Sequence, residues 1–164
     1  MAMSRKVKEV MEAGNLLRRV ENKYSTRIDW WCEKNLASVE KVRKIVTNRL
    51  PHVEEVRKDL ARIETKKQVD DLEKQKAEKP ESWTEDHEKV LVKKTEQLST
   101  MPAMEQKTLD EFNAAVRVEE ESEIDITFKT LNIKYLPGWD NAAEKIYSRE
   151  QLGFLHYMGL LTED

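Results

Sequence analysis

The sequence has a single cysteine, Cys32, and only four glycines and four prolines among its 164 residues. One cysteine excludes a disulfide within the chain and fits a reducing compartment. So few glycines and prolines argue against a β-rich fold with many turns. The histidines His52, His87 and His156 are far apart and show no metal-ligand spacing, so we expect neither a metal site nor a cofactor.

Catalytic motifs and long apolar runs are also missing. The sequence contains no G-x-G-x-x-G, P-loop or G-x-S-x-G motif, and its acidic run near residue 120 lacks the glycine and spacing of an EF-hand loop. We therefore expect a protein that is not an enzyme. No apolar run approaches the roughly 20 residues that cross a bilayer, and charged residues occupy the place of a signal-peptide core. These features predict no membrane contact, no signal peptide and a location inside a cell.

Charge is abundant and unevenly distributed along the chain. Charged residues make up 37% of the sequence and hydrophobic residues 38%, which is typical of long solvated helices rather than a thick globule. Positive charge dominates residues 1–49, whereas residues 110–125 are strongly acidic. Two interpretations stay open: two solvated faces that attract one another, or a docking surface for an acidic partner or a second copy.

Residues 32–63 carry a heptad pattern of apolar side chains. The two rows of the pattern are Val39, Val46, Val53 and Leu60, and Val42, Arg49, Val56 and Ile63. A helix with this spacing shows a continuous apolar seam that needs a partner helix. Pro51 interrupts the seam, so the segment is either one kinked helix or two helices that meet there. The unbroken heptad register favours the kinked helix.

The other helices follow from similar signals. Residues 3–22 have helical apolar spacing and predict a first helix. The segments 32–63 and 83–118 are predicted to form a long antiparallel, coiled-coil-like hairpin with a charged tip near 70–82, where Pro80 ends the first arm. Capping boxes at Ser82 and Thr108 predict helix starts in the returning arm. Residues 1–121 would then form one helical domain.

Residues 122–164 are predicted to form an arm of strand and helix. Apolar and polar residues alternate from Ile124 to Tyr135, which predicts one extended strand or a small β-hairpin. A capping box at Ser148 predicts a short terminal helix. The expected fold is therefore mainly α: the helical hairpin, an N-terminal helix, and a small C-terminal β-strand or hairpin followed by the short helix.

Large apolar side chains supply the candidate partner-binding residues. The adjacent tryptophans point about 100° apart on a helix, so one of them tends to lie at the rim of the core. A single strand leaves an edge open for another chain, and the terminal helix is rich in aromatic residues. The candidates are Trp30, Trp31, Ile126, Phe128, Ile133, Tyr135, Trp139, Phe154, Tyr157 and Leu160. The competing interpretation is packing within the chain, with the arm closing the end of the hairpin.

Nucleic-acid binding is a further possibility that the sequence raises. Basic residues near aromatic ones can grip phosphate and stack on bases. The residues concerned are Arg5, Lys6, Lys8, Arg18, Arg19, Lys23 and Arg27, near Tyr24, Trp30 and Trp31. Glutamates interrupt this set and the sequence pI is about 5.8, so we do not expect nucleic acid as the partner.

The order of these segments resembles a group of small helical proteins of tailed bacteriophages and prophages. A charged helix containing RIDWWCEKNLASVEKVRK precedes a returning segment, LDEFNAAVRVEEESEIDITFKTLNIKYLP, and a terminal helix that starts S-x-x-Q-L. In that group a returning helix runs into an acidic E-x-E-I-D-I-type strand, a leucine-bearing linker and a terminal helix. The resemblance is specific over residues 109–136 and 148–161. Pro51, Pro102 and the paired tryptophans depart from it.

The resemblance implies a context rather than a catalytic site. We expect a non-enzymatic phage structural or assembly protein that contacts protein subunits, as an oligomer or in a larger assembly. The alternative is a phage protein that binds and inhibits a host protein or defence system, and the third hypothesis is a nucleic-acid-binding accessory protein. The expected location is the host cell cytoplasm or the virion.

Overall fold

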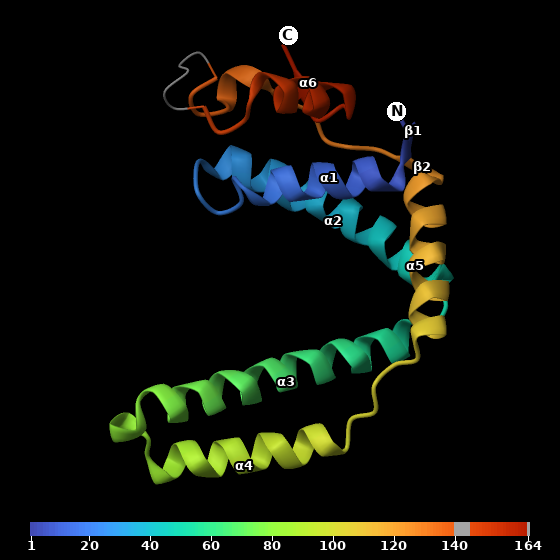
Figure 1. The fold of residues 1–164 in the computed structure, drawn as a ribbon. Helices are drawn as coiled ribbons and strands as arrows, with labels where there is room; N and C mark the ends of the chain where they lie inside the picture. The colour runs from blue at the N-terminus through green and yellow to red at the C-terminus, as the bar shows by residue number, and fades with distance from the viewer. Residues whose placement is uncertain (140–144, 164) are drawn as a thin grey trace. The chain divides into compact units, whose positions relative to one another are not determined.

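The computed structural model describes residues 1–139 and 145–163, which are mainly helical (Figure 1). They form two compact units, Met1–Arg49 with Val116–Asp164, and Leu50–Ala115. The chain is therefore divided elsewhere than at residue 121, the predicted end of the helical domain. The helix α5 (Gln106–Glu121) runs through the boundary at Val116.

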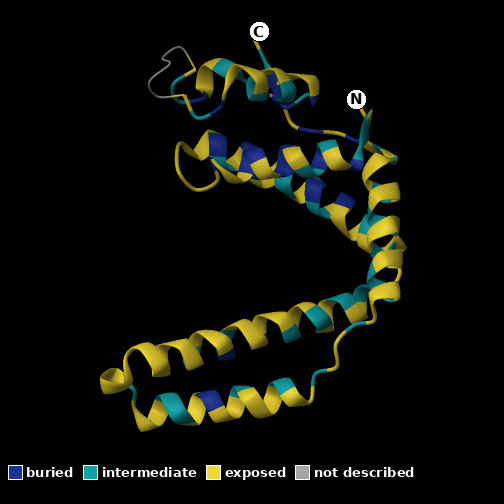
Figure 2. Cartoon of the chain, viewed as in Figure 1, coloured by how far each residue is buried: buried dark blue, intermediate teal, exposed yellow. Residues whose placement is uncertain are grey.

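The first unit packs its helices around one apolar core. Its elements are β1 (Met3–Lys6), α1 (Val7–Arg18), α2 (Thr26–Arg49), β2 (Glu123–Ile126), β3 (Leu131–Asn132), the 3₁₀ turn η2 (Ile133–Tyr135), α6 (Arg149–Tyr157) and β4 (Leu161–Thr162). Val10 and Leu17 of α1 meet Trp31 and Val39 of α2 in this core, together with Leu155 of α6. Figure 2 shows the buried residues concentrated in these elements.

Two short strand pairs complete the first unit. The β1 strand pairs antiparallel with β2, with Met3 opposite Ile126, and β3 pairs parallel with β4, with Leu131 opposite Leu161. The prediction of a helix from residue 3 is therefore wrong at its start, because the backbone of β1 bonds to β2 instead. Ile133–Tyr135 form a 3₁₀ turn rather than strand, and the Asn132 side chain accepts a hydrogen bond from the Lys134 N–H.

The second unit is built on an antiparallel hairpin of α3 (Val53–Glu78) and α4 (Glu85–Ser99), which lie side by side in Figure 1. The 3₁₀ turn η1 (Pro80–Ser82) connects them. The predicted hairpin is thus confirmed as a motif, but its arms differ from the predicted segments. Residues 32–49 belong to α2, which packs on α1, and the return is broken between Ser99 and Gln106 around Pro102.

The helix does not continue through Pro51. The α2 helix ends at Arg49, and His52 adopts a left-handed backbone conformation with φ 57° before α3 begins at Val53. Proline cannot donate a helical hydrogen bond, and it disfavours the helical conformation of the residue before it. The α2 helix therefore ends before Pro51. The prediction of one kinked helix is wrong, and the two-helix alternative is the one observed.

The heptad seam is consequently split between the two units. In α2, Val39 and Val42 are buried in the core. In α3, Leu60 and Ile63 remain 60% and 49% exposed, whereas Val69 is buried. At 100° per residue, Leu60 and Ile63 lie on roughly the opposite side of α3 from Val69. The apolar seam is continuous in the sequence, but only its α2 residues, Val39 and Val42, are buried in the core of the first unit.

Two of the three predicted capping boxes are misplaced. The α4 helix begins at Glu85, and its N-cap is Thr84, two residues after Ser82. Thr84 Oγ1 accepts the His87 N–H, and His87 Nδ1 accepts the Thr84 N–H. Thr108 lies inside α5, which has already begun at Gln106. The Ser148 box is confirmed, because its side chain accepts the Gln151 N–H and Gln151 Oε1 accepts the Ser148 N–H.

Candidate protein-binding groove

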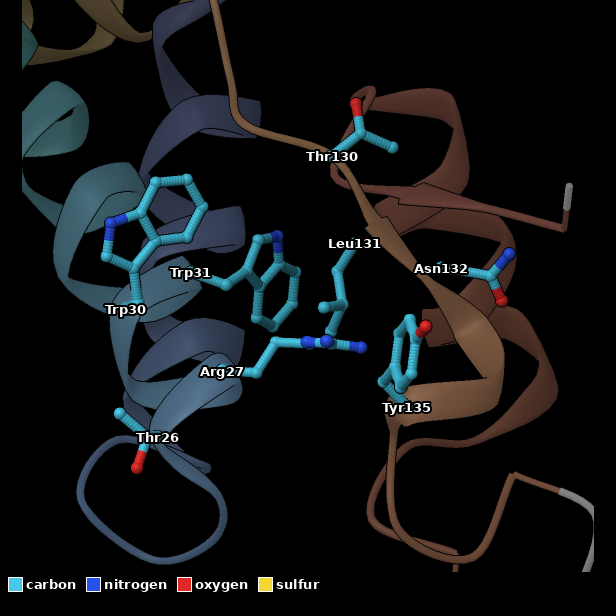
Figure 3. Close-up of a pocket in the computed structure, with 8 residues that line it drawn as sticks. All are labelled: Thr26, Arg27, Trp30, Trp31, Thr130, Leu131, Asn132 and Tyr135. Carbon is cyan, nitrogen blue, oxygen red and sulfur yellow. The ribbon is translucent and has the colours of Figure 1, made fainter.

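A groove of about 640 Å³ opens in the first unit between the start of α2 and the β3–η2 segment (Figure 3). Four residues from α2 and four from the opposite segment line it: Thr26, Arg27, Trp30, Trp31, Thr130, Leu131, Asn132 and Tyr135. The surface is mainly apolar and aromatic, with hydroxyl, amide and guanidinium groups among it. This composition is that of a binding site with a few orienting polar groups.

Buried residues hold the inner wall of the groove in place. Trp31 is fully buried, and its indole N–H donates to the carbonyl oxygens of Lys129, at 2.9 Å, and Leu160, at 3.2 Å. Leu131 is 5% exposed and sits in the β3–β4 pair. Because this wall belongs to the core, the groove is formed before any partner arrives.

Exposed cationic and aromatic side chains form the rim. The Arg27 guanidinium lies 4.0 Å from the centre of the Tyr135 ring, and the Lys134 ammonium lies 5.3 Å from the same centre. Figure 3 shows Arg27 extending from α2 toward Tyr135, while Trp30 leaves α2 in a different direction from Trp31. Trp30 is 49% exposed. A guanidinium stacked on a ring keeps its in-plane N–H donors available to a carboxylate.

A basic stripe continues from the groove along α2. Its residues recur at intervals of three and four, so they share one helix face. They are Arg27, Trp30, Lys34, Ala37 and Lys41, all of them exposed. The three cations form no ion pair with any residue in the described ranges 1–139 and 145–163. Glu33 borders the stripe beside Trp30, and the stripe itself contains no acidic residue.

The structure separates the predicted partner-binding residues into three sets. Trp31, Ile126, Phe128 and Leu160 are buried in the core, where they pack within the chain and are not accessible to a partner. Ile133 and Phe154 are partly buried against that core. The exposed residues are Trp30, Tyr135, Trp139 and Tyr157. Only the first two of these come together at the groove, and partner binding by the exposed residues stays a prediction.

Sequence reasoning missed part of this site. The sequence pattern associates Arg27 with the basic residues nearer the N-terminus, and it gives no signal for Leu131 or Lys134. The helical spacing of Arg27, Trp30 and Lys34 was visible in the sequence. The opposite wall was not, because it depends on how β3 and η2 lie against α2.

Several of the seven basic residues in the candidate nucleic-acid cluster contact other residues of the first unit. The ammonium groups of Lys6 and Lys8 bind the Glu121 carboxylate. Arg5 stacks on Tyr157, 4.0 Å from its ring centre, and donates to the Tyr157 carbonyl oxygen. These cations are engaged within the chain, so they do not form one open surface with Arg27.

The single cysteine, Cys32, is buried in the core. Burial raises the pKa of Cys32 to about 12, with smaller contributions from Glu21 and Asp29, so its thiol stays protonated and unreactive. In the part of the chain that the structure describes, no cluster of His, Cys, Asp and Glu side chains has an arrangement suited to a metal ion. No described helix combines the length and apolar character needed to cross a membrane.

Comparison with known proteins gave no match: no family model, no curated protein and no solved structure matches this chain.

Proposed function

We propose that this protein is a non-enzymatic assembly protein that acts through protein–protein contacts, as a structural or assembly component of a phage particle. The observation that carries the proposal is the half-exposed Trp30 beside the Arg27–Tyr135 pair, at the mouth of a preformed apolar groove. Tryptophan, tyrosine and arginine are the residues enriched in the energetic centres of protein interfaces. A rigid groove also lowers the entropic cost of binding.

The lining of the groove suits recognition rather than chemistry. Thr26, Thr130 and Asn132 offer hydroxyl and amide groups that orient a polypeptide, and Arg27 offers a guanidinium. The exposed aromatic rings of Trp30 and Tyr135 offer apolar area that a partner side chain would cover. These properties support binding of a protein segment.

The second unit supports a role in an assembly. Leu60 and Ile63 of α3, and Val90 and Val92 of α4, are between 44% and 60% exposed. A two-helix hairpin with so few buried apolar residues gains little stability from its own core. Covering such side chains with another subunit would remove apolar surface from water and stabilise the hairpin.

The phage context of the proposal comes from the sequence resemblance. The alternative function, inhibition of a host protein or defence system, would use the same groove. A phage protein that inhibits a host protein or defence system would also present an exposed tryptophan and arginine to a partner. The two functions differ in where the partner comes from. Nucleic acid remains the third possibility, with phosphate in place of carboxylate at Arg27.

Site-specific photo-crosslinking tests the proposed function. Benzoylphenylalanine replaces Trp30 in one variant and the exposed Trp139, which lies outside the groove, in a matched control. Both are expressed in cells that carry the gene, and cross-linked products are identified by mass spectrometry. We expect cross-links from position 30 to a particle subunit that is also present in purified virions. A host protein at position 30 would favour the inhibitor function, and equal yields at both positions would contradict a protein-binding groove.

A further inference from the structure

The basic stripe carries three cations on one helix face that no carboxylate pairs with among the described residues. Some other cations of the first unit do have such partners: Lys6 and Lys8 bind Glu121, and Arg49 lies 3.7 Å from Glu119. Arg27, Lys34 and Lys41 lack such partners among the described residues. Together they give one helix face a row of positive charge, which an anionic partner would complement.

The spacing of the stripe fits carboxylates on another helix. Arg27, Lys34 and Lys41 are each seven residues apart, which places successive cations about 10.5 Å apart along α2. Carboxylates seven residues apart on a partner helix repeat at the same distance, so three ion pairs can form together. Trp30 lies one turn from Arg27 and marks where an apolar side chain of that helix would enter the groove.

From this arrangement, and resting on the proposed protein-binding function, we infer that the groove and the stripe bind an acidic amphipathic helix. The carboxylates of that helix pair with Arg27, Lys34 and Lys41, and one of its apolar side chains packs against Trp30. The Arg27 guanidinium lies 4.0 Å from the centre of the Tyr135 ring at the groove, where it is placed to pair with a carboxylate of the partner helix.

Single-stranded nucleic acid fits the same surface less well. Binding of that kind uses several aromatic platforms on which successive bases stack. Trp31 is fully buried and cannot stack on a base. The Tyr135 ring is already in contact with the Arg27 and Lys134 cations. Trp30 is then the one open platform that the groove provides among its lining residues. A helix with a single apolar anchor matches this arrangement better than a strand of stacked bases.

The test uses the full-length chain, ¹⁵N-labelled, and follows tryptophan indole signals by NMR. The first probe is an alanine-rich helical peptide with three glutamates spaced seven residues apart and a leucine three residues after the first. The second probe has glutamine in place of each glutamate, and the third is oligothymidylate. The Trp30 indole reports on the groove, and the Trp31 indole, bonded to Lys129, reports that the fold is intact.

Charge variants on α2 supply matched controls. Arg27→Gln and Lys34→Gln remove stripe cations, whereas Arg43→Gln removes an exposed cation from the opposite side of the same helix. We expect the glutamate peptide to shift Trp30 and to bind several-fold more tightly than the glutamine peptide. Each stripe variant should weaken its binding about threefold, as for an exposed ion pair, and Arg43→Gln should leave it unchanged. Added salt should weaken binding as well.

Three results would overturn the inference, and they differ in what they mean for the proposed function. Equal binding of both peptides at Trp30 would show a protein groove without preference for acid. Loss of affinity in Arg43→Gln equal to that in Arg27→Gln would show general attraction by net charge. Binding of oligothymidylate at Trp30, with no shift from either peptide, would contradict both the acidic helix and the proposed function.

Discussion

The side-chain amide of Asn35 is paired with both backbone groups of Lys129. Its nitrogen donates to the Lys129 carbonyl oxygen at 2.9 Å, and the Lys129 N–H donates to its oxygen at 2.7 Å. Asn35 is completely buried in α2, and Trp31 donates to the same carbonyl from one turn earlier. One asparagine thus fixes the segment before β3 to α2 and positions the far wall of the groove.

Replacing Asn35 with alanine should destabilise the first unit. The Lys129 carbonyl would keep Trp31 as a donor, but the part-buried Lys129 N–H would lose its acceptor. We expect a loss of about 1–3 kcal/mol in the free energy of unfolding, measured by urea denaturation. Asn113→Ala, at an exposed position of α5, is the control and should change stability by less than about 0.5 kcal/mol. Equal effects in the two variants would show that the Asn35 pair contributes nothing.

The backbone of α1 at Gly14 lies close to the Val39 side chain of α2. A Cβ atom added there would lie 2.8 Å from Val39 Cγ1, and Val39 is fully buried and stiff at χ1. Although alanine favours helix over glycine, we expect Gly14→Ala to lose about 1 kcal/mol because of this overlap. Gly153→Ala in α6, where a Cβ meets nothing within 4 Å, should instead gain about 0.5–1 kcal/mol.

A double variant checks the cause at Gly14. Val39→Ala removes the methyl groups that the new Cβ would meet, at the cost of a small cavity. If overlap is the cause, Gly14→Ala should be nearly neutral or stabilising when introduced into Val39→Ala. An equal loss in both backgrounds, measured by thermal melts, would point to a cause other than contact with Val39.

Local signals in the sequence predicted some elements well. The helical class, the hairpin motif and the Ser148 capping box each depend on residues within a few positions of one another. The unbroken heptad register predicts one kinked helix across Pro51. In the structure α2 ends at Arg49 and a left-handed His52 precedes α3, so the repeat in the sequence continues although the helix does not. The β1 strand could not be found, because its sequence MSRK has no strand pattern and its conformation depends on pairing with β2, more than 100 residues later.

The groove also depends on contacts between residues far apart in the sequence, which local patterns do not show. Adjacent tryptophans point about 100° apart on a helix, so the sequence indicates that one of Trp30 and Trp31 tends to lie at the rim of the core. Which of them is buried depends on the Lys129 and Leu160 carbonyls, which come from distant parts of the chain. The seam residues show it again: Val39 and Leu60 occupy equivalent heptad positions, and only tertiary packing distinguishes their environments.

That difference gives a direct test of the split seam. Val39→Asp would place a carboxylate in the core of the first unit, where Val39 has no exposed surface, and should cost several kcal/mol or prevent folding. Leu60→Asp alters a side chain that is 60% exposed and should change stability by less than about 1 kcal/mol. Circular dichroism melts compare the two. Equal destabilisation would show that the seam on α3 is covered after all.

Acid should weaken the contact between the end of α5 and the start of the chain. Glu121 binds Lys6, at 2.7 Å, and Lys8. These hydrogen bonds and the accompanying charge attraction lower the pKa of Glu121 from 4.5 to about 2. Because the folded state favours the ionised carboxylate, its stabilisation is complete above the unfolded pKa and is lost as the pH falls from there through about 2.

Glu121→Gln removes this ionisation and isolates its contribution. We expect the wild-type chain to melt above the variant at pH 7, and the difference to close as the pH approaches 2. The pair is exposed, so added salt at pH 7 should also reduce the difference. Glu120→Gln is the matched control, since Glu120 forms no ion pair within the described residues, and its melting should follow wild type across the range. If the gap between wild type and Glu121→Gln is the same at every pH, the carboxylate acts through packing rather than through its charge.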